Sequence, residues 1–159
     1  MQKNEIIIPA IAEDGTLYPV EKMEAHRKGQ QHLAISVFVF SGTKLLIQQR
    51  AASKYHCPGK WANTCCTHPY WGETVEDAAS RRIREELGFA IPLSGTTVID
   101  YRADVGAGLI ENERVHVFQG HADESTLAIA PNNEEVAAIR WQEVAELPRL
   151  QTAQPDTLC

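Results

Sequence analysis

The chain has 159 residues, of which 43% are hydrophobic, and its formal net charge is −6. This length suits a single domain, residues 1–159, whose core needs no disulfide or metal to support it. The negative net charge argues against a nucleic-acid partner, and no apolar run approaches the ~18 residues of a membrane span.

The four cysteines are expected to be free thiols: Cys57, Cys65, Cys66 and Cys159. The adjacent pair Cys65 and Cys66 cannot easily bond to each other, and a domain of this size does not need bridges. The N-terminal segment has one lysine and a short apolar run broken by Pro9, which is not the pattern of a signal peptide. We therefore expect a soluble, cytoplasmic protein that is a monomer or a weak homodimer.

Basic side chains are concentrated in one part of the sequence. From Lys22 to Arg84 there are ten Lys or Arg and four Asp or Glu, a net charge of +6, whereas the rest of the chain carries −12. A basic segment within an acidic protein favours a small anionic ligand. Chance clustering of charges on solvated faces would give the same count.

The first half of the chain predicts strands. Residues 5–20 form two short apolar runs around Asp14-Gly15, the pattern of a hairpin. Residues 32–40 are nearly all apolar and predict a strand buried on both faces, followed by a second strand at 44–50. Residues 51–72 contain two prolines and two glycines and predict a long structured loop, which in a compact domain is usually functional.

Residues 75–87 predict the clearest helix, with acidic residues in its first turn, apolar residues at four-residue spacing and Gly88 as its stop. The remaining elements are expected to be strands at 96–103, 112–118 and 136–141, then a short helix at 142–147 that ends at Pro148. Together these elements predict an α/β or α+β sandwich with one prominent central helix.

Two carboxylates in E-N-E, Glu111 and Glu113, are one residue apart in a predicted strand, so they share a face with Val115 and Val117. Two acids on a face that continues as core are costly unless a cation joins them. Both would instead meet water if the strand had not yet entered the sheet. The pattern favours a metal or catalytic site.

The histidines His26, His32 and His68 are further candidate ligands, because imidazole and carboxylate suit Mn²⁺ or Zn²⁺, while carboxylate and phosphate suit Mg²⁺. A lone histidine is more often structural, and their spacing fits no zinc-finger motif. A structural zinc site is an alternative, although the C-x-x-C spacing is missing; its ligands would be His56, Cys57, Cys65, Cys66 and His68.

Residues 67–89 resemble a degenerate Nudix box, G-x5-E-x7-R-E-U-x-E-E-x-G-U, in which U is apolar. Thr67 stands in place of the opening Gly, and Arg82 replaces the Glu that an ordinary Nudix hydrolase needs for its metal. The resemblance implies a Nudix fold, a mixed β-sheet sandwich flanked by helices with the box helix at its centre. The matching residues are Glu73, Arg81, Ile83, Glu85, Glu86, Gly88 and Phe89.

The departures from the box fit one branch of this superfamily, the type I isopentenyl-diphosphate Δ-isomerases. From about residue 4 to 148 the chain contains segments that resemble that family's in the same order, and N-T-C-C-T-H-P with E-N-E is the most specific part. The resemblance implies an enzyme of isoprenoid biosynthesis that moves the double bond of isopentenyl diphosphate to give dimethylallyl diphosphate. The matching segments are E-K-M-E-A-H, H-L-A-I-S, Q-Q-R-A-A-S-K-Y, P-G-K-W-A-N-T-C-C-T-H-P, Y-R-A and E-N-E.

The resemblance also implies roles for single residues. Cys66 is similar in position to the catalytic thiol, and Glu113 to the opposing acid or base, with Tyr101 beside it. Glu86 resembles the ligand of a second metal ion, Mg²⁺, which also holds the diphosphate. The first metal ion, Mn²⁺, Mg²⁺ or Zn²⁺, would be held by His26, His32, His68, Glu111 and Glu113. The diphosphate contacts would be Lys22, Arg50, Lys54 and Arg82.

Members of this family continue with a Thr-Pro-Trp segment and a final helix, and the Trp ring faces the carbocation. The sequence stops at Cys159 without a matching segment, and Trp141 does not correspond to that Trp. We expect this difference to remove a cation–π contact worth ~0.5–2 kcal/mol and part of the pocket wall.

Two other functions stay open from the sequence. A Nudix hydrolase would cleave a diphosphate and release phosphate, and Arg82 and Cys66 argue against it. A non-catalytic protein of the same fold would bind a ligand without chemistry. Such a protein has no reason to keep Cys66, Tyr101, Glu111 and Glu113 together.

Overall fold

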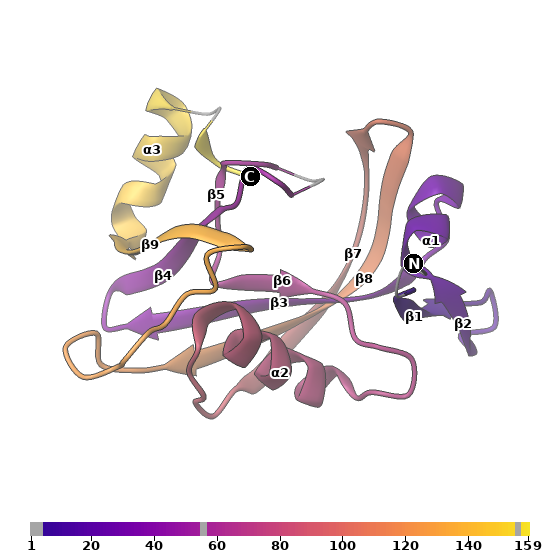
Figure 1. The fold of residues 1–159 in the computed structure, drawn as a ribbon, viewed down its shortest axis with the longest axis horizontal. Helices are drawn as coiled ribbons and strands as arrows, with labels where there is room; N and C mark the ends of the chain where they lie inside the picture. The colour runs from indigo at the N-terminus through magenta and orange to yellow at the C-terminus, as the bar shows by residue number, and fades with distance from the viewer. Residues whose placement is uncertain (1–4, 55–56, 155–156) are drawn as a thin grey trace.

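The structure, a computed structural model, describes residues 5–54, 57–154 and 157–159. Within them, nine strands form one mixed sheet (Figure 1). The strand β3 (His32–Ser41) lies at its centre, because it pairs with β8 (Leu109–His121) over most of its length and also with β1, β4 and β6. Of the pairings in this part of the chain, β3–β8 is parallel and the others are antiparallel.

The expected N-terminal hairpin is present as β1 (Ile7–Ile11) and β2 (Leu17–Glu21). Gly15 at its turn has φ +87°, a conformation that favours glycine. A short helix, α1 (Lys22–Lys28), follows directly and was not predicted from the sequence. Its start is capped by the Glu21 carboxylate, which accepts hydrogen bonds from the backbone N–H groups of Met23 and Glu24.

The helix α2 (Val75–Leu87) has the predicted bounds. Thr74 caps its start by accepting a hydrogen bond from the Asp77 N–H, and Gly88 ends it with φ +72°. A Cβ at residue 88 would lie 2.7 Å from the carbonyl oxygen of Ala130, so glycine is required there by space as well as by backbone conformation.

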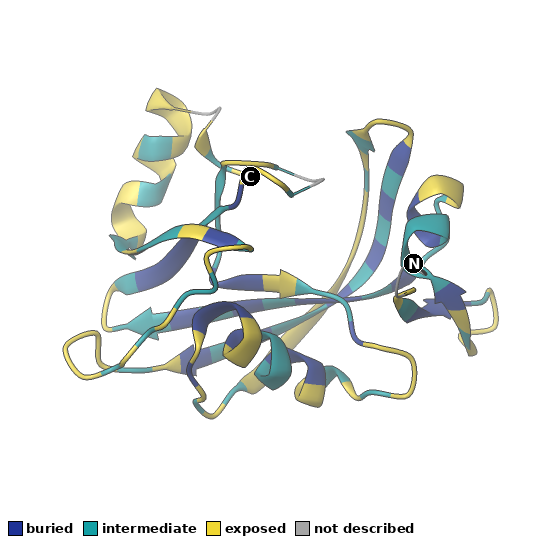
Figure 2. Ribbon diagram, viewed as in Figure 1, coloured by how far each residue is buried: buried dark blue, intermediate teal, exposed yellow. Residues whose placement is uncertain are grey.

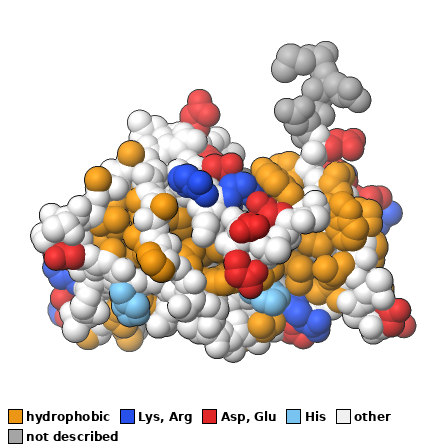
Figure 3. All heavy atoms as spheres, turned by 90° about the horizontal axis from the view of Figure 1, so that it is seen from below, with side chains coloured by type: hydrophobic (Ala, Val, Ile, Leu, Met, Phe, Trp, Pro, Cys, Tyr) orange, Lys and Arg blue, Asp and Glu red, His pale blue; other side chains and the backbone are white. Residues whose placement is uncertain are grey.

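One face of β3 packs against α2 and forms the main core. Ile35, Val37 and Val39 point to this side, where they meet Ile83 and Leu87 of the helix. Buried residues line this inner side of α2 and the strands above it (Figure 2). The outer side of α2 is charged, and acidic and basic side chains adjoin one another near the middle of that face of the molecule (Figure 3).

The second half of the chain completes the sheet. A long hairpin of β7 (Ser94–Gly106) and β8 extends the sheet beyond β3, and β9 (Val136–Glu143) pairs with β4 (Lys44–Arg50). The strands predicted here are confirmed, but β7 and β8 run several residues further at both ends than the apolar pattern indicated. The mixed sheet with its central helix agrees with the predicted fold class.

The long loop predicted at 51–72 is wrong in part, because it contains two short strands. These are β5 (Trp61–Ala62), which pairs with β4, and β6 (Cys65–Thr67), which pairs with β3 at residues 35–37. Strands of two or three residues are too short to show a period in the sequence. They form because existing strands of the sheet offer them backbone partners.

The helix predicted at 142–147 is also wrong. The strand β9 continues to Glu143, a 3₁₀ turn covers Val144–Glu146, and α3 occupies Leu147–Ala153. Pro148 lies in the first turn of α3 and does not end a helix. Proline is tolerated there because its missing N–H has no acceptor in the first turn of a helix.

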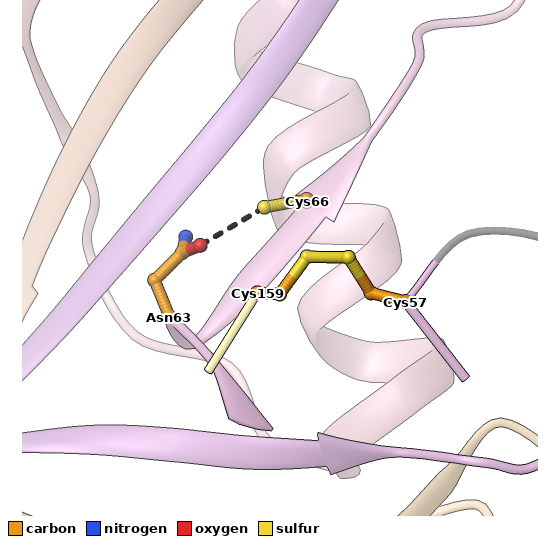
Figure 4. Close-up of a disulfide and its surroundings, with 4 residues drawn as sticks. All are labelled: Cys57, Asn63, Cys66 and Cys159. Carbon is orange, nitrogen blue, oxygen red and sulfur yellow. Dashed lines mark hydrogen bonds between the residues drawn. A yellow bond between two sulfur atoms is a disulfide. The ribbon is translucent and has the colours of Figure 1, made fainter. Parts of the chain in front are cut away.

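The expectation of four free thiols is wrong for two of them. Cys57 and Cys159 form a disulfide that joins positions 102 residues apart, and Figure 4 shows it close to β6. The C-terminal residues are brought to this place by backbone pairing, since the Cys159 N–H donates to the Trp61 carbonyl and Leu158 bridges to Trp61. Cys65 and Cys66 are free, as expected. Free thiols therefore support the expected cytoplasmic location at Cys65 and Cys66 alone.

Among the described residues, no helix is both long enough and apolar enough to cross a bilayer.

Reduction of the Cys57–Cys159 disulfide is expected to lower the free energy of unfolding by about 2–4 kcal/mol, because the bridge closes a long loop in the unfolded chain. Urea unfolding with and without dithiothreitol measures this change. Cys57→Ser should unfold like the reduced protein and should not respond to the reductant. Identical unfolding curves for the oxidised and reduced wild type would contradict the prediction.

Candidate active site

The pleat of β6 separates the two adjacent cysteines. Residues along a strand alternate between its faces, and β6 pairs Cys66 with Ser36 and Cys65 with Val37 of β3. Cys65 is completely buried in the core against α2. Cys66 is on the opposite face, where it lines two pockets. Of the two adjacent cysteines, Cys66 therefore reaches the pockets and Cys65 does not.

Asn63 and Ser36 contact the Cys66 thiol. The Asn63 amide nitrogen donates to the backbone carbonyls of Val37 and Cys65, which turns its Oδ1 toward Cys66 Sγ, 3.0 Å away (Figure 4). Ser36 Oγ is 3.7 Å from the same sulfur. Desolvation among the pocket walls raises the pKa of the Cys66 thiol, and these hydrogen bonds lower it only in part. The sulfur therefore holds its proton in the resting protein.

Three histidines and one carboxylate meet on the same side of the sheet as Cys66. His26 comes from α1, His32 from the start of β3, His68 from the residue after β6, and Glu113 from β8. One ligand atom from each lies within 4.8 Å of all the others. The parallel pairing of β3 with β8 places His32 opposite Glu113. Segments that are far apart in the sequence thus build one compact donor set.

Hydrogen bonds orient these rings. The backbone carbonyls of Lys22 and Gln30 accept from Nδ1 of His26 and His32, at 2.7 and 2.8 Å. In each ring this leaves the lone pair on Nε2, the arrangement typical of metal-binding histidines. The buried Nε2 of His32 has no hydrogen-bond partner among the described residues and lies 3.4 Å from Glu113 Oε2. A divalent cation fits this donor set, since it would satisfy that nitrogen and the carboxylate together.

The charges of the cluster are set by burial and by each other. Desolvation lowers the pKa of His68 to about 4, although Glu113 Oε2 lies 2.9 Å from its Nε2. Burial opposes the ionisation of Glu113, but its hydrogen bond with His68 outweighs this and holds its pKa well below the usual range. At neutral pH the site therefore holds neutral imidazole at His68 and an ionised carboxylate, the forms that bind metal.

Two other predicted residues lie near this cluster but outside it. Glu111 is buried two residues before Glu113 on the same face of β8, so the strand has already entered the sheet at this point, contrary to the alternative interpretation of E-N-E. Its oxygens are not among the four clustered donors. Tyr101 pairs with Glu113 across β7 and β8. Desolvation and the charges of Glu111 and Glu113 raise the pKa of the Tyr101 phenol, which keeps its proton.

A pocket of about 380 Å³ is lined by the four predicted diphosphate contacts. Because these side chains are positively charged, it is called the cation pocket. Lys22 begins α1, Arg50 ends β4, Lys54 follows in the next loop, and Arg82 comes from α2. Desolvation and the neighbouring charges of Lys54, Arg82 and Arg50 lower the pKa of Lys22. Cations that repel one another in this way form a site for an anion with several charges.

Two carboxylates balance part of this charge. Glu86 is buried and accepts hydrogen bonds from Arg82 and from Gln48, the latter at 2.9 Å. Glu135 accepts from Arg82 at 2.7 Å and from Lys54 at 3.0 Å. Glu86 lines this cation pocket and does not belong to the His/Glu113 cluster. Sequence reasoning gave no role to Glu135, Gln48 or Asn63, although Gln48 and Asn63 lie within segments that match the family.

A second pocket, of about 320 Å³, adjoins the first. Four residues line both pockets: Arg50, Cys66, Thr67 and His68. Tyr101, Glu111 and Glu113 line only the second, together with apolar residues such as Ile35, Ile99 and Val115. The cation pocket thus adjoins, at Cys66, a second pocket that has apolar walls and contains Tyr101 and Glu113.

The proposed ligands of a structural zinc site do not come together in the described residues. Cys57 is bonded to Cys159, and Cys65 points into the core. His56 lies outside the described residues.

Known proteins with similar sequences belong to the family that the sequence motifs resemble. The NUDIX domain family matches residues 30–158. Proteins called isopentenyl-diphosphate Delta-isomerase from Cereibacter sphaeroides and Rhodobacter capsulatus are each 53% identical, over 144 and 153 residues. These matches cover 90% and 96% of this chain and 81% and 86% of those proteins. The chain belongs to the isopentenyl-diphosphate Δ-isomerase family of Nudix proteins.

Solved structures confirm the Nudix fold of this family member. A protein from Deinococcus radiodurans aligns with a TM-score of 0.73 over 93% of this chain and 90% of its own, at 15% identity. A MutT NUDIX hydrolase from Burkholderia pseudomallei aligns with a TM-score of 0.62 over 75% and 88%, at 24% identity. At these identities the likeness concerns the fold. The predicted family and fold are both confirmed.

Removal of one charge from the cluster tests whether it binds metal. Glu113→Gln is expected to weaken binding of Mn²⁺ or Zn²⁺ by about 100-fold or more, because even partners outside the ligand shell contribute 10–100-fold. Isothermal titration calorimetry measures the affinity. Glu111→Gln should have a smaller effect, because its carboxylate lies outside the four clustered donors. Unchanged affinity in Glu113→Gln would remove this residue from the ligand set.

The lowered pKa of His68 predicts how stability depends on pH in the metal-free protein. Its folded pKa of about 4 lies below the value of 6.5 for the unfolded chain, so the unfolded state takes up a proton first as the pH falls. The free energy of unfolding should therefore decrease from pH 6.5 towards pH 4. His26, whose pKa burial also lowers, contributes in the same direction.

Urea unfolding at several pH values measures this slope. His68→Asn should flatten it, whereas His121→Gln, at an exposed position on β8, serves as the matched control. Equal slopes in the wild type and His68→Asn would contradict the assignment.

Proposed function

We propose that this enzyme converts isopentenyl diphosphate to dimethylallyl diphosphate by adding a proton on one face of the alkene and removing another on the opposite face. The observation that carries the proposal is the junction of the two pockets. Cys66 stands where the cation pocket meets the pocket that holds Tyr101 and Glu113. A ligand with a diphosphate head and a short apolar tail matches that junction.

The diphosphate is bound in the cation pocket by Lys22, Arg50, Lys54 and Arg82. Glu135 holds Lys54 and Arg82 through hydrogen bonds before the ligand arrives, so less ordering is needed on binding. The binding energy of this charged head fixes the position of the five-carbon tail, which has few features of its own to recognise.

A divalent cation, Mn²⁺, Mg²⁺ or Zn²⁺, would be held by His26, His32, His68 and Glu113, with Glu111 beside them. When bound there it polarises the groups around it, which makes a neighbouring proton more acidic. Glu86 would hold a second ion, Mg²⁺, next to the diphosphate. Its carboxylate is already fixed in the cation pocket by Gln48 and Arg82.

The alkene is a poor base, so its protonation needs a strong acid and apolar walls that exclude water. On one side Tyr101 keeps its proton next to the ionised Glu113, and this pair delivers a proton to the terminal carbon. A tertiary carbocation forms at the branched carbon. Loss of a proton from the adjacent CH₂ then completes the new double bond.

Cys66 removes that second proton from the opposite side. In the resting protein the thiol is protonated and donates to Asn63 Oδ1, so before the ligand binds it must release this proton to solvent, to which Cys66 is exposed. The raised pKa of Cys66 makes its thiolate a stronger base once it has formed. The cysteine thus transfers a proton and does not attack the substrate.

Diphosphate hydrolysis is less well supported. Arg82 replaces the metal-binding Glu of the hydrolase box and is held by Glu85, Glu86 and Glu135.

We further propose that the enzyme acts in the cytoplasm as a monomer or weak homodimer, as expected from the sequence.

The two cysteines allow a matched test. Cys66→Ala is expected to lower kcat by about 10²–10⁴-fold, the usual contribution of one acid–base group, while leaving the fold intact. Cys65→Ala removes the neighbouring thiol from the core and should change kcat little, at a modest cost in stability. Production of dimethylallyl diphosphate is measured for both variants. Near-normal turnover by Cys66→Ala would exclude the role of its thiol.

A further inference from the structure

A third cavity lies next to the two that form the candidate active site. Its volume is about 380 Å³, and Ala62, Asn63 and Cys159 line both it and the Tyr101/Glu113 pocket. The three cavities therefore form a series. The cation pocket meets the second pocket at Cys66, and the second meets the third at Ala62. The proposed reaction uses only the first two.

The pleat of β3 places the second and third cavities on the same face of the sheet. Ala34 and Ser36 line the second cavity, and Phe38 lines the third. These residues alternate with the core residues and so point to one face of the sheet. Because Phe38 is two residues beyond Ser36, the third cavity begins ~7 Å further along the same strand.

The lining of the third cavity is mostly apolar. Polar side chains enter it at Asn63 and Gln151, and the latter is an exposed residue of α3. No Lys, Arg, Asp or Glu belongs to its described lining. The apolar lining comes from β3, β4, β5, α3 and the C-terminal residues, and it includes Phe38, Ile47, Trp61, Leu147, Pro148 and Leu158.

We infer that this third cavity is a binding site for the tail of linear prenyl diphosphates longer than five carbons. The ligand places its diphosphate in the cation pocket, its first isoprene unit beside Cys66, and its further units along β3 against Phe38 and Trp61. Such a compound competes with isopentenyl diphosphate. The inference rests on the proposed function, because it uses the same diphosphate site.

The sizes of the cavities support this occupant. Each apolar cavity alone has the volume of a small ligand site, about 300 Å³ or more. A five-carbon tail is held within the second and does not use the third. A tail of ten or fifteen carbons follows the β3 face for the ~7 Å that separates Ser36 from Phe38 and reaches the apolar walls.

A ligand series tests the inference by isothermal titration calorimetry, with inorganic diphosphate, isopentenyl diphosphate, geranyl diphosphate and farnesyl diphosphate as probes. The dissociation constant is expected to fall about tenfold with each added isoprene unit, the gain when roughly two of its five carbons leave water. Equal dissociation constants for the five- and fifteen-carbon compounds would overturn the inference.

Two variants at Gln151 locate the tail. Gln151→Asp places a carboxylate in the apolar cavity and should weaken farnesyl diphosphate about tenfold, because the charge must lose water. Gln151→Leu should strengthen it severalfold. Both should leave the affinity for isopentenyl diphosphate within about twofold. The matched control is Gln154→Asp, because Gln154 ends the same helix but does not line the cavity.

The outcomes separate the two proposals. If the wild type binds neither inorganic diphosphate nor isopentenyl diphosphate, the proposed function fails. If it binds both but the Gln151 variants leave farnesyl diphosphate unchanged, the tail does not occupy the third cavity and this inference is wrong. A loss of farnesyl affinity in Gln154→Asp equal to that in Gln151→Asp would also overturn it.

Discussion

The alternation of side chains along β3 is the constraint on which the rest of the structure depends. One face of this strand carries Ile35, Val37 and Val39 into the core against α2. The other face carries His32, Ala34 and Ser36 past the metal cluster and the second pocket. Because β6 and β8 both pair with β3, they inherit this division. A shift of one residue in the β6 pairing would bury Cys66 and expose Cys65, and a shift of one residue in the β8 pairing would turn Glu113 away from His32.

Charge in the candidate site is balanced only in part before any ligand binds. Lys22, Arg50, Lys54 and Arg82 share one pocket with Glu86 and Glu135, and the carboxylates hold Lys54 and Arg82 in place. The cluster beside it contains three imidazoles and one carboxylate, of which His68 is neutral at physiological pH because of its burial. The cation pocket therefore favours an anionic ligand, and the His/Glu113 cluster favours a cation. This complementarity favours a metal-assisted reaction of a diphosphate.

Long elements could be predicted from the sequence, because a periodic pattern needs many residues to be recognised, and short elements could not. The periodicity of residues 75–87 gave α2 with its correct bounds, and the apolar run at 32–40 gave β3. Short elements failed, because α1, β5 and β6 show no period and Pro148 is ambiguous between ending and starting a helix. The family motifs pointed to Cys66 and Glu113, but the roles of Asn63, Gln48 and Glu135 depend on contacts between elements and could not be predicted from the motifs. The Cys57–Cys159 disulfide was missed because the size of the domain does not indicate which cysteines lie close together in the folded chain.

Proton transfer to and from the alkene is the central claim, and its most direct test is isomerisation in D₂O. The purified chain is incubated with isopentenyl diphosphate, Mg²⁺ and Mn²⁺, and the products are followed by proton NMR. The account predicts that dimethylallyl diphosphate accumulates and carries deuterium from the solvent. Release of inorganic phosphate without isomerisation, or a product that contains no deuterium, would contradict it.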